Sequence, residues 1–305
     1  MSLILKGIAN TGTGKTAAFL VPLIQNLIAK DNNFQTLILV PTRELALQVE
    51  DEFKSLSKGL GLSCACFIGR TSVSQDISKL KKRNNMIIGT PGRLLDLINR
   101  RKLNLHNFSR LILDEFDRML DMGFIDDVKK ISKEQTMLFS ATENKKQNAL
   151  IGEFLNNPTE IKPSSGSTSA KHIDQDVVNV YKGEDKFGVL LGMVKSEEYN
   201  KVLIFAETKK RVTRIADRLK KYGIGSDEIH GDKSQGYRKK ALNNFRKGKI
   251  KVLVATDVAA RGIDVDDITH VINYQVPQHM DSYMHRIGRT GRAGKSGKAL
   301  TLVDQ

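Results

Sequence analysis

The chain of 305 residues contains no tryptophan, two cysteines and six prolines, and aromatic residues make up 6% of it. So few aromatic side chains argue against a platform on which many bases stack. Cys64 and Cys66 share the apolar run LSCACFIG, and no second cysteine pair or histidine cluster accompanies them. This argues against a zinc site of the usual spacing and favours reduced thiols in a cytosolic protein.

Long hydrophobic runs are also missing. No apolar stretch reaches the length that spans a membrane, and MSLIL is too short for a signal peptide. We therefore expect a cytoplasmic protein without a membrane partner. The net charge is +15 and both halves of the chain are basic, which favours a polyanionic partner, with nucleic acid ahead of a membrane surface. A soluble protein that is merely basic remains the alternative.

Short apolar runs alternate with helical patterns along the whole chain. The runs rich in β-forming residues are 36–40, 64–69, 85–90, 110–115, 136–142, 201–208, 251–258, 269–276 and 298–304. Strand and helix in alternation predict parallel α/β sheets with both faces covered. The Ser- and Gly-rich stretch KPSSGSTSAK interrupts the pattern. We expect two domains, 1–163 and 173–305, joined by a flexible linker at 164–172.

The segment ANTGTGKT, residues 9–16, has the composition of a phosphate-binding loop. Small residues let backbone N–H groups approach phosphates, and the following helix points its positive end at them. Lys15 would reach the terminal phosphates and the Thr16 hydroxyl would hold Mg²⁺. Ala9 stands where the strict pattern has glycine, so an ordinary Gly-rich turn remains possible from this segment alone.

The segment LILDEFD places two adjacent acids at the end of an apolar strand. Ligands of open α/β sheets bind at that carboxyl edge. Asp114 could hold Mg²⁺, and Glu115 could orient and deprotonate a water molecule. A solvated acidic turn is the alternative, but the phosphate loop upstream favours the catalytic interpretation.

The segment HRIGRTGR, residues 285–292, concentrates arginine in the second half of the chain. Arg289 and Arg292 are three residues apart and could converge on one phosphoryl group. An arginine directed at the γ-phosphate stabilises the charge that develops during hydrolysis. A basic surface that faces RNA explains the same residues equally well.

Together these segments resemble the DEAD-box RNA helicases. The stretches ANTGTGKT, PTRELA, TPGR, DEFD, SAT, ATDVAARGID and HRIGRTGR occur in the order and spacing of that family, from Ala9 to about Asp304. The resemblance implies two RecA-like domains that close over ATP, Mg²⁺ and single-stranded RNA, in a protein that acts as a monomer. It also implies RNA-dependent ATP hydrolysis coupled to local unwinding of duplexes.

The resemblance also implies a role for individual residues at the nucleotide. The phosphate and ribose contacts are Gly12, Thr13, Gly14, Lys15, Thr16, Gly262 and Asp264. The catalytic residues are Lys15, Asp114, Glu115, Arg289 and Arg292, and the metal ligands are Thr16 and Asp114. The residues that couple the ATP state to domain closure are Asp117, Ser140 and Thr142.

RNA contacts in the family fall on other motifs. Carried over to this sequence, they are Pro41, Thr42, Arg43, Gly69, Thr90, Gly92, Arg93, Thr208, Arg238 and Thr256. These are loop amides, hydroxyls and arginines, which grip phosphate and sugar without reading bases. We therefore expect weak sequence preference, strong salt dependence and a preference for RNA over DNA.

The sequence departs from the family pattern in a few places. Phe116 replaces alanine in the acidic motif, and Arg70 replaces the second of two glycines. No segment with an adenine-reading glutamine precedes the phosphate loop, and LILKG resembles the end of a helix, so we expect a shortened first strand in a truncated chain. The missing adenine-reading segment and the shortened first strand support an alternative function, an RNA-binding module with impaired ATP turnover.

Overall fold

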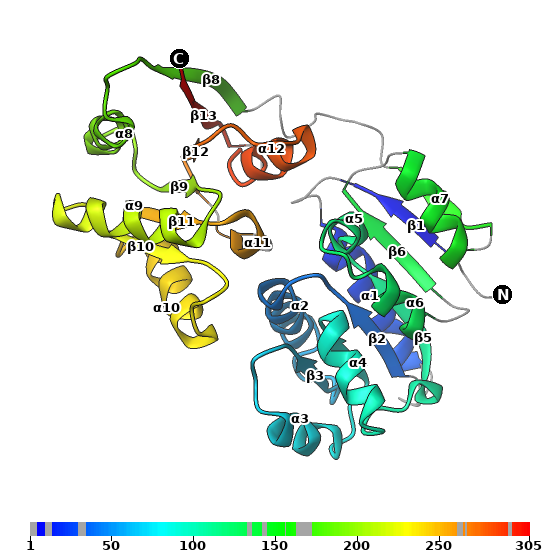
Figure 1. Ribbon diagram of the computed structural model, residues 1–305. Helices are drawn as coiled ribbons and strands as arrows, with labels where there is room; N and C mark the ends of the chain where they lie inside the picture. Colours follow the sequence, from blue (N-terminus) through cyan, green and yellow to red (C-terminus); the bar gives the residue numbers. More distant parts are fainter. Residues whose placement is uncertain are drawn as a thin grey trace. The chain divides into compact units, whose positions relative to one another are not determined.

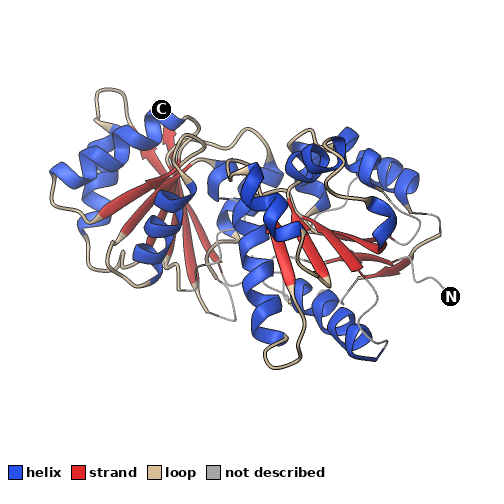
Figure 2. Cartoon of the chain, turned by 90° about the horizontal axis from the view of Figure 1, so that it is seen from below, coloured by secondary structure: helices blue, strands red, loops and turns tan. Residues whose placement is uncertain are grey.

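The computed structural model describes most of the chain and divides it into two compact units, Met1–Gly166 and Ser167–Gln305. The described residues are 5–9, 14–29, 35–132, 136–141, 145–155, 157–162, 173–260, 265, 267–291 and 295–305. Each unit is a parallel sheet flanked by helices, which confirms the expected α/β class. Figure 2 shows both sheets as strands between helical layers.

The first unit contains a seven-stranded sheet in the order β3-β4-β2-β5-β6-β1-β7 (Figure 1). Its strands are β1 Leu5–Ile8, β2 Gln35–Leu39, β3 Cys64–Phe67, β4 Met86–Gly89, β5 Phe108–Leu113, β6 Thr136–Ser140 and β7 Thr159–Ile161. Its helices are α1 Lys15–Ala29, α2 Arg43–Leu56, α3 Val73–Leu80, α4 Pro91–Asn99, the 3₁₀ turn η1 Leu105–Asn107, α5 Phe116–Asp121, α6 Ile125–Ile131 and α7 Lys145–Phe154.

The second unit contains a six-stranded sheet in the order β10-β11-β9-β12-β13-β8. Its strands are β8 Ile173–Val180, β9 Val202–Phe205, β10 Ser226–Ile229, β11 Val252–Ala255, β12 His270–Asn273 and β13 Gly297–Asp304. Its helices are α8 Lys186–Lys195, α9 Lys209–Lys221, α10 Gln235–Arg246, α11 Asp257–Ala260 and α12 Met280–Ile287. All six tyrosines of the chain belong to this unit.

Strand side chains alternate between two hydrophobic layers in each unit, as the pleat requires. In β2, Leu37 and Leu39 belong to one buried cluster, whereas Ile38 joins α1 and α2 in the other. In β9, Ile204 packs with α8 and α9, and Leu203 packs with α10 and α11. Because both faces are covered, the strands have the continuous apolar runs on which the prediction depended.

The first strand corrects one expectation. LILKG was expected to resemble the end of a helix, but its residues Leu5 to Gly7, together with Ile8, form the four-residue strand β1. Its four residues pair in parallel with β6, and Leu5 to Gly7 also pair with β7. Lys6 lies buried within this strand, where its Nζ donates to Asn148 Oδ1 at 3.0 Å and to Glu160 Oε2 at 3.2 Å. The strand was not recognised in the sequence because Lys6 interrupts its apolar pattern. The residues that bond to Lys6 are 142 and 154 positions away in the chain.

Candidate functional site

The predicted residues of the first unit that the structure describes lie at the carboxyl edge of its sheet, in two neighbouring groups. Strands β5, β6 and β1 are adjacent, and they lead into the acidic motif, Ser140 and the phosphate loop. Strands β3, β4 and β2 are adjacent on the other side, and they lead into the segments expected to hold RNA. The sheet order thus separates the two groups of predicted residues along one edge.

The phosphate loop delivers Lys15 to the first position of α1. Gly14 has a φ of +85°, a left-handed conformation that glycine adopts without strain, and its carbonyl accepts the first helical bond from Ala18 N at 3.0 Å. The Nζ of Lys15 donates to the carbonyl of Ala9, directly after β1. Ala9 N in turn donates to Ser140 O at 3.0 Å, which ties the start of the loop to β6.

The acidic motif follows β5 without a break in the sheet. Asp114 N donates to Leu39 O at 3.0 Å, so the ladder with β2 holds the backbone of the first acid. Glu115 N donates to Asp114 Oδ1 at 3.0 Å. Glu115 has a φ of 52°, a left-handed conformation that is unusual for a residue with a side chain. Such strain clusters at functional sites, where the surrounding structure imposes it.

The charges of the two motifs act on each other. Asp114 is 2% exposed, and burial raises the pKa of its carboxyl to about 7. Lys15 opposes this rise in the pKa, whereas Glu115 adds to it. The lysine of the phosphate loop and the acids after β5 therefore converge on one place. A carboxylate that is costly to ionise alone is suited to a site that a cation completes.

Arg118 was not predicted as part of this site. It is 1% exposed, lies on α5, and its Nε is 3.3 Å from Glu115 Oε2. Asp117 is buried beside it, and Phe116 packs edge-on against Phe154 in the core. The spacing of three residues between an acid and an arginine at a helix start was the signal that could have found Arg118.

The loops after β2 and β3 meet next to each other. Thr42 is the N-cap of α2 and accepts a hydrogen bond from Leu45 N at 3.3 Å. A Cβ on Gly69 would lie 3.5 Å from the guanidinium of Arg43, so the backbone of Gly69 runs directly beside that side chain. Arg70 follows with a φ of 64°, where the glycine typical of the family would be unstrained.

The loop after β4 contains Thr90, the N-cap of α4, followed by Pro91 at the helix start. Arg93 points back into the protein: its side chain is 7% exposed and its Nε donates to Ile68 O at 3.0 Å. The same guanidinium bonds to Thr71 O and lies 3.5 Å from Asp76. Arg93 thus joins α4 to the loop that contains Gly69.

The second unit repeats this arrangement on strands β10, β11 and β9, which are neighbours. Thr208 is the N-cap of α9 and accepts from Arg211 N at 3.2 Å. Thr256 follows β11, and its carbonyl accepts from the backbone of α11. Arg238 on α10 is buried and donates to Ala259 O at 3.4 Å. The three predicted residues therefore follow neighbouring strands of one sheet, Thr208 and Thr256 in the loops after β9 and β11 and Arg238 in the first turn of α10, after β10.

The arginines of HRIGRTGR have different surroundings. Arg286 is buried and forms a bidentate ion pair with Asp257, at 2.5 and 2.6 Å, and its Nη1 donates to Asn273 Oδ1 at 3.1 Å. It thereby joins α12 to α11 and β12, a role that the sequence analysis did not assign. Arg289 follows α12, is also buried, and donates to His285 O at 3.3 Å.

Some predicted residues lie outside the part of the chain that the structure describes. They are Gly12, Thr13, Thr142, Gly262, Asp264, Arg292 and the linker 164–172. Among the described helices, none is both long and apolar enough to cross a membrane.

Comparison with known proteins agrees with this geometry. The profile of the DEAD/DEAH box helicase family matches residues 3–150, and the profile of the helicase conserved C-terminal domain matches residues 185–294. The ATP-dependent RNA helicase CshA of Listeria monocytogenes is 46% identical over 302 residues. That alignment covers 97% of this chain and 58% of CshA, so the chain spans little more than half of this relative.

Solved structures show the same fold. Dbp5 of S. cerevisiae, bound to RNA and ADP BeF3, is 30% identical with a TM-score of 0.87, over 99% of this chain and 80% of Dbp5. A DEAD box protein from the hyperthermophile Methanococcus jannaschii is 42% identical with a TM-score of 0.55, over 99% of this chain and 83% of that protein. With its phosphate loop, its DEFD motif and these matches, the chain belongs to the DEAD-box helicase family.

Proposed function

We propose that this chain is an ATP-dependent RNA helicase, which couples hydrolysis of ATP to RNA binding and to local separation of short duplexes. One observation carries the proposal: the lysine of a phosphate loop and the buried acids after β5 converge at one sheet edge, where the charge of Lys15 acts on Asp114. Its relatives in Listeria monocytogenes and Bacillus subtilis are named as ATP-dependent RNA helicases, which supports the same activity.

We assign the chemical step to residues of both units. In residues 1–163, the loop Gly12–Thr16 would hold the phosphates, and Glu115 would orient and deprotonate the attacking water. In residues 173–305, Arg289 and Arg292 would stabilise the charge that develops on the γ-phosphate, and Gly262 and Asp264 would contact the ribose. The buried position of Arg289 and the left-handed backbone of Glu115 are the structural support for these roles.

The residues at the phosphate loop fit Mg²⁺. Asp114 offers a carboxylate whose burial disfavours its charge in the absence of a cation, and Thr16 offers a hydroxyl at the start of α1. Mg²⁺ takes oxygen ligands, keeps several waters and is held by one or two side chains together with phosphates. When bound, it would offset the negative charge of the phosphates.

We assign RNA binding to the remaining loops of both carboxyl edges. Pro41, Thr42, Arg43, Gly69, Thr90, Gly92 and Arg93 serve it in the first unit, and Thr208, Arg238 and Thr256 in the second. Arg93 would act by holding the Gly69 loop, because its guanidinium is already bonded to that loop. We assign the link between the ATP state and RNA grip to Asp117, Ser140 and Thr142. ATP and RNA would then each strengthen binding of the other.

Hydrolysis of ATP with and without RNA tests the proposal. We expect hydrolysis that rises with single-stranded RNA, and displacement of a short duplex that needs ATP. Lys15→Ala should lose ATP binding because it removes the cation that meets the phosphates. Glu115→Gln should bind ATP but hydrolyse it at least about 100-fold more slowly, the typical contribution of a general base.

Lys58→Ala, an exposed lysine at the amino edge of the same sheet, is the matched control and should hydrolyse ATP at the parental rate. Parental hydrolysis by Glu115→Gln would refute the assignment of the base. An ATPase rate that does not respond to RNA would refute the proposed coupling and favour an enzyme of another class.

A further inference from the structure

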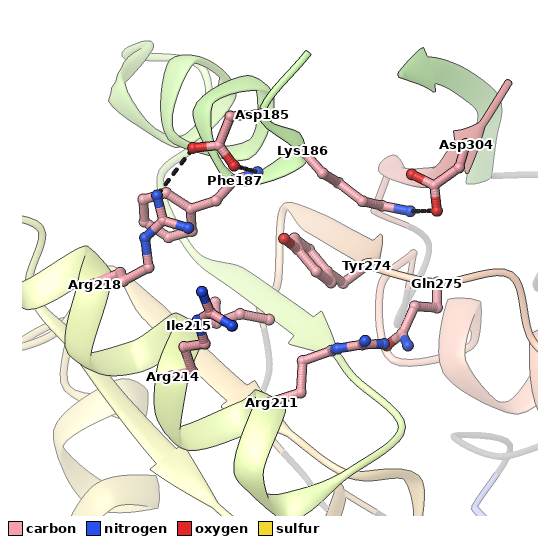
Figure 3. A pocket seen from close by; sticks show the side chains of 10 residues that line it. All are labelled: Asp185, Lys186, Phe187, Arg211, Arg214, Ile215, Arg218, Tyr274, Gln275 and Asp304. Carbon is pink, nitrogen blue, oxygen red and sulfur yellow. Dashed lines mark hydrogen bonds and ion pairs between the residues drawn. The ribbon is translucent and has the colours of Figure 1, made fainter. Parts of the chain in front are cut away.

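A pocket with a volume of about 260 Å³ opens in the second unit, and none of its lining residues has a role in the proposed function. It lies between the start of α8, one face of α9 and the ends of β12 and β13 (Figure 3). Its lining is strongly basic, with arginines from α9 and Lys186 from α8.

Three arginines of α9 share one face of the helix. Arg211, Arg214 and Arg218 are spaced by three and four residues, so they lie one above another. Arg218 is fixed: its Nη2 donates to Asp185 Oδ2 at 2.9 Å and its guanidinium lies 3.8 Å from the centre of the Phe187 ring. Figure 3 shows Arg218 against Phe187 and Asp185 at one end of the pocket.

The opposite end of the pocket is fixed in a similar way. Lys186 Nζ donates to Asp304 Oδ2 at 2.8 Å and to Leu302 O at 3.3 Å, and it lies 5.6 Å from the centre of the Tyr274 ring. Burial, ahead of the charge of Asp185, raises the pKa of the Tyr274 hydroxyl, so this group stays protonated and can donate. Both carboxylates that line the pocket are therefore already paired with a cation.

Arg211 and Arg214 are left between these fixed ends. Both are exposed, and within the described ranges neither has an ion-pair partner. The amide oxygen of Gln275, which could accept from an arginine, already accepts a hydrogen bond from Glu207 N at 3.2 Å. Four cationic and two carboxylate side chains line the pocket, which leaves it with an excess of positive charge.

We propose that this pocket binds an oligophosphate, with Arg211 and Arg214 each holding one of two linked phosphoryl groups. Guanidinium groups bind tetrahedral oxyanions through paired N–H donors, and here two of them stand one helical turn apart. The volume leaves room for more than a single phosphate. The phosphates come from a free oligophosphate or from the backbone of an RNA strand, and the test separates these sources.

Binding of tripolyphosphate, measured by calorimetry, tests the site. The Lys15→Ala chain serves as the parent, because it lacks the phosphate grip of the ATP loop. Adding Arg211→Ala with Arg214→Ala should weaken binding at least about tenfold, since two charge-assisted contacts are lost. The matched control is Lys210→Ala with Lys221→Ala, which removes the same charge from exposed positions of α9 outside the pocket. It should change the affinity less than about twofold.

Equal weakening by the two pairs of substitutions would overturn the proposal, because general charge would then explain binding. Absence of tripolyphosphate binding to the Lys15→Ala parent would also overturn it, as would equally tight binding of polyglutamate. Arg211 and Arg214 are exposed, so their substitution should leave the midpoint of unfolding at the parental value. An unchanged midpoint then shows that weaker binding is not caused by loss of folding.

A second experiment identifies the source of the phosphates. It measures the affinity for single-stranded RNA at several salt concentrations, on the chain with Lys15 intact. If RNA occupies the pocket, Arg211→Ala with Arg214→Ala should reduce the salt slope by about 0.7 for each lost phosphate contact. An unchanged slope assigns the pocket to a free oligophosphate. Neither result depends on ATP hydrolysis, so failure of the proposed helicase activity would not be mistaken for failure of this site.

Discussion

Single residues at the sheet edges combine a backbone role with a chemical one. Gly14 adopts the left-handed conformation that starts α1, and Glu115 adopts a left-handed conformation although it has a side chain. Glycine pays little for such a backbone, whereas a residue with a Cβ is strained there. The chain keeps a strained residue where we place the general base. The strain is consistent with a position selected for its chemistry rather than for stability.

The two thiols give a pH test at the residue scale. Burial raises the pKa of Cys64 to about 12 and also raises the pKa of Cys66, because a thiolate loses hydration inside the protein. A raised pKa keeps the thiol protonated at higher pH, so only about 0.01% of Cys64 is thiolate at pH 8. We expect slow alkylation by iodoacetamide at pH 8, about tenfold faster for each further pH unit up to pH 10.

The same protein in concentrated urea is the control, and there both thiols should react rapidly. Fast alkylation of the folded chain at pH 8 would contradict the burial of Cys66 and the partial burial of Cys64.

Gly89 tests the packing of a single backbone position. A Cβ there would lie 2.6 Å from the carbonyl oxygen of Phe67 and 2.9 Å from Leu94 Cγ, and the carbonyl belongs to a neighbouring strand that cannot turn away. We expect Gly89→Ala to lower the free energy of unfolding by about 2 kcal/mol, the usual range for overpacking. Chemical denaturation followed by circular dichroism measures the loss.

Gly152 on α7 is the matched control, because nothing lies within 4 Å of the Cβ it would gain. Gly152→Ala should leave stability unchanged or raise it by about 0.5–1 kcal/mol, since alanine is the better helix former. Equal effects of the two substitutions would contradict the close approach at Gly89.

At the scale of elements, the helices α11 and α12 are held by a polar contact rather than by apolar packing alone. Arg286 of α12 pairs with Asp257 of α11 through two bonds, and it is buried. Removing Arg286 leaves the carboxylate of Asp257, whose side chain is 30% exposed, without its cation, and it leaves the buried Oδ1 of Asn273 without this donor. We expect Arg286→Met to destabilise the second unit by about 3 kcal/mol, measured by denaturation with the tyrosine absorbance as reporter.

Pairing Arg286→Met with Asp257→Asn completes a double-mutant cycle. The second substitution should recover part of the loss, because it removes the orphaned carboxylate. Additive effects of the two substitutions would show that the ion pair contributes no coupling.

The sequence predicted those strands that are apolar on both faces, and it missed the ones that are not. Strand β8 is exposed at most of its positions, β10 reads SDEI, and β7 is fully exposed, so none has the run of apolar residues that marks a buried strand. The order of the motifs predicted the ends of β5 and β6, where the acids and Ser140 lie. The partners of Arg93 and Arg286 could not be predicted, because they depend on long-range contacts.

At the scale of the whole molecule, the two units have separate hydrophobic cores. With no tryptophan, and with every tyrosine in the second unit, tyrosine absorbance reports that unit alone. We expect circular dichroism to show two unfolding transitions during denaturation. The tyrosine signal should follow only the transition of the second unit, so the other transition belongs to the first. A non-hydrolysable ATP analogue with Mg²⁺, at a concentration 100 times its dissociation constant, should raise the free energy of unfolding of the first unit by about 2.7 kcal/mol.

The transition that tyrosine absorbance reports is the internal control, and its midpoint should not change when nucleotide is added without RNA. One transition that all probes follow would show that the two cores unfold as a single cooperative unit.

Apart from Arg289, the described residues to which we assign ATP or RNA lie in the loops and first helical turns that follow the carboxyl ends of strands, and this leaves the opposite edges largely without an assigned task. The turns that lead into β3, β10 and β11 lie there, and they contain Gly59, Gly61, Gly223 and Gly248 with positive φ and open space around them. These turns are the natural places to insert a tag, a fluorophore or a foreign peptide without disturbing the chemistry. The same freedom gives evolution room to attach new domains to a fixed catalytic core.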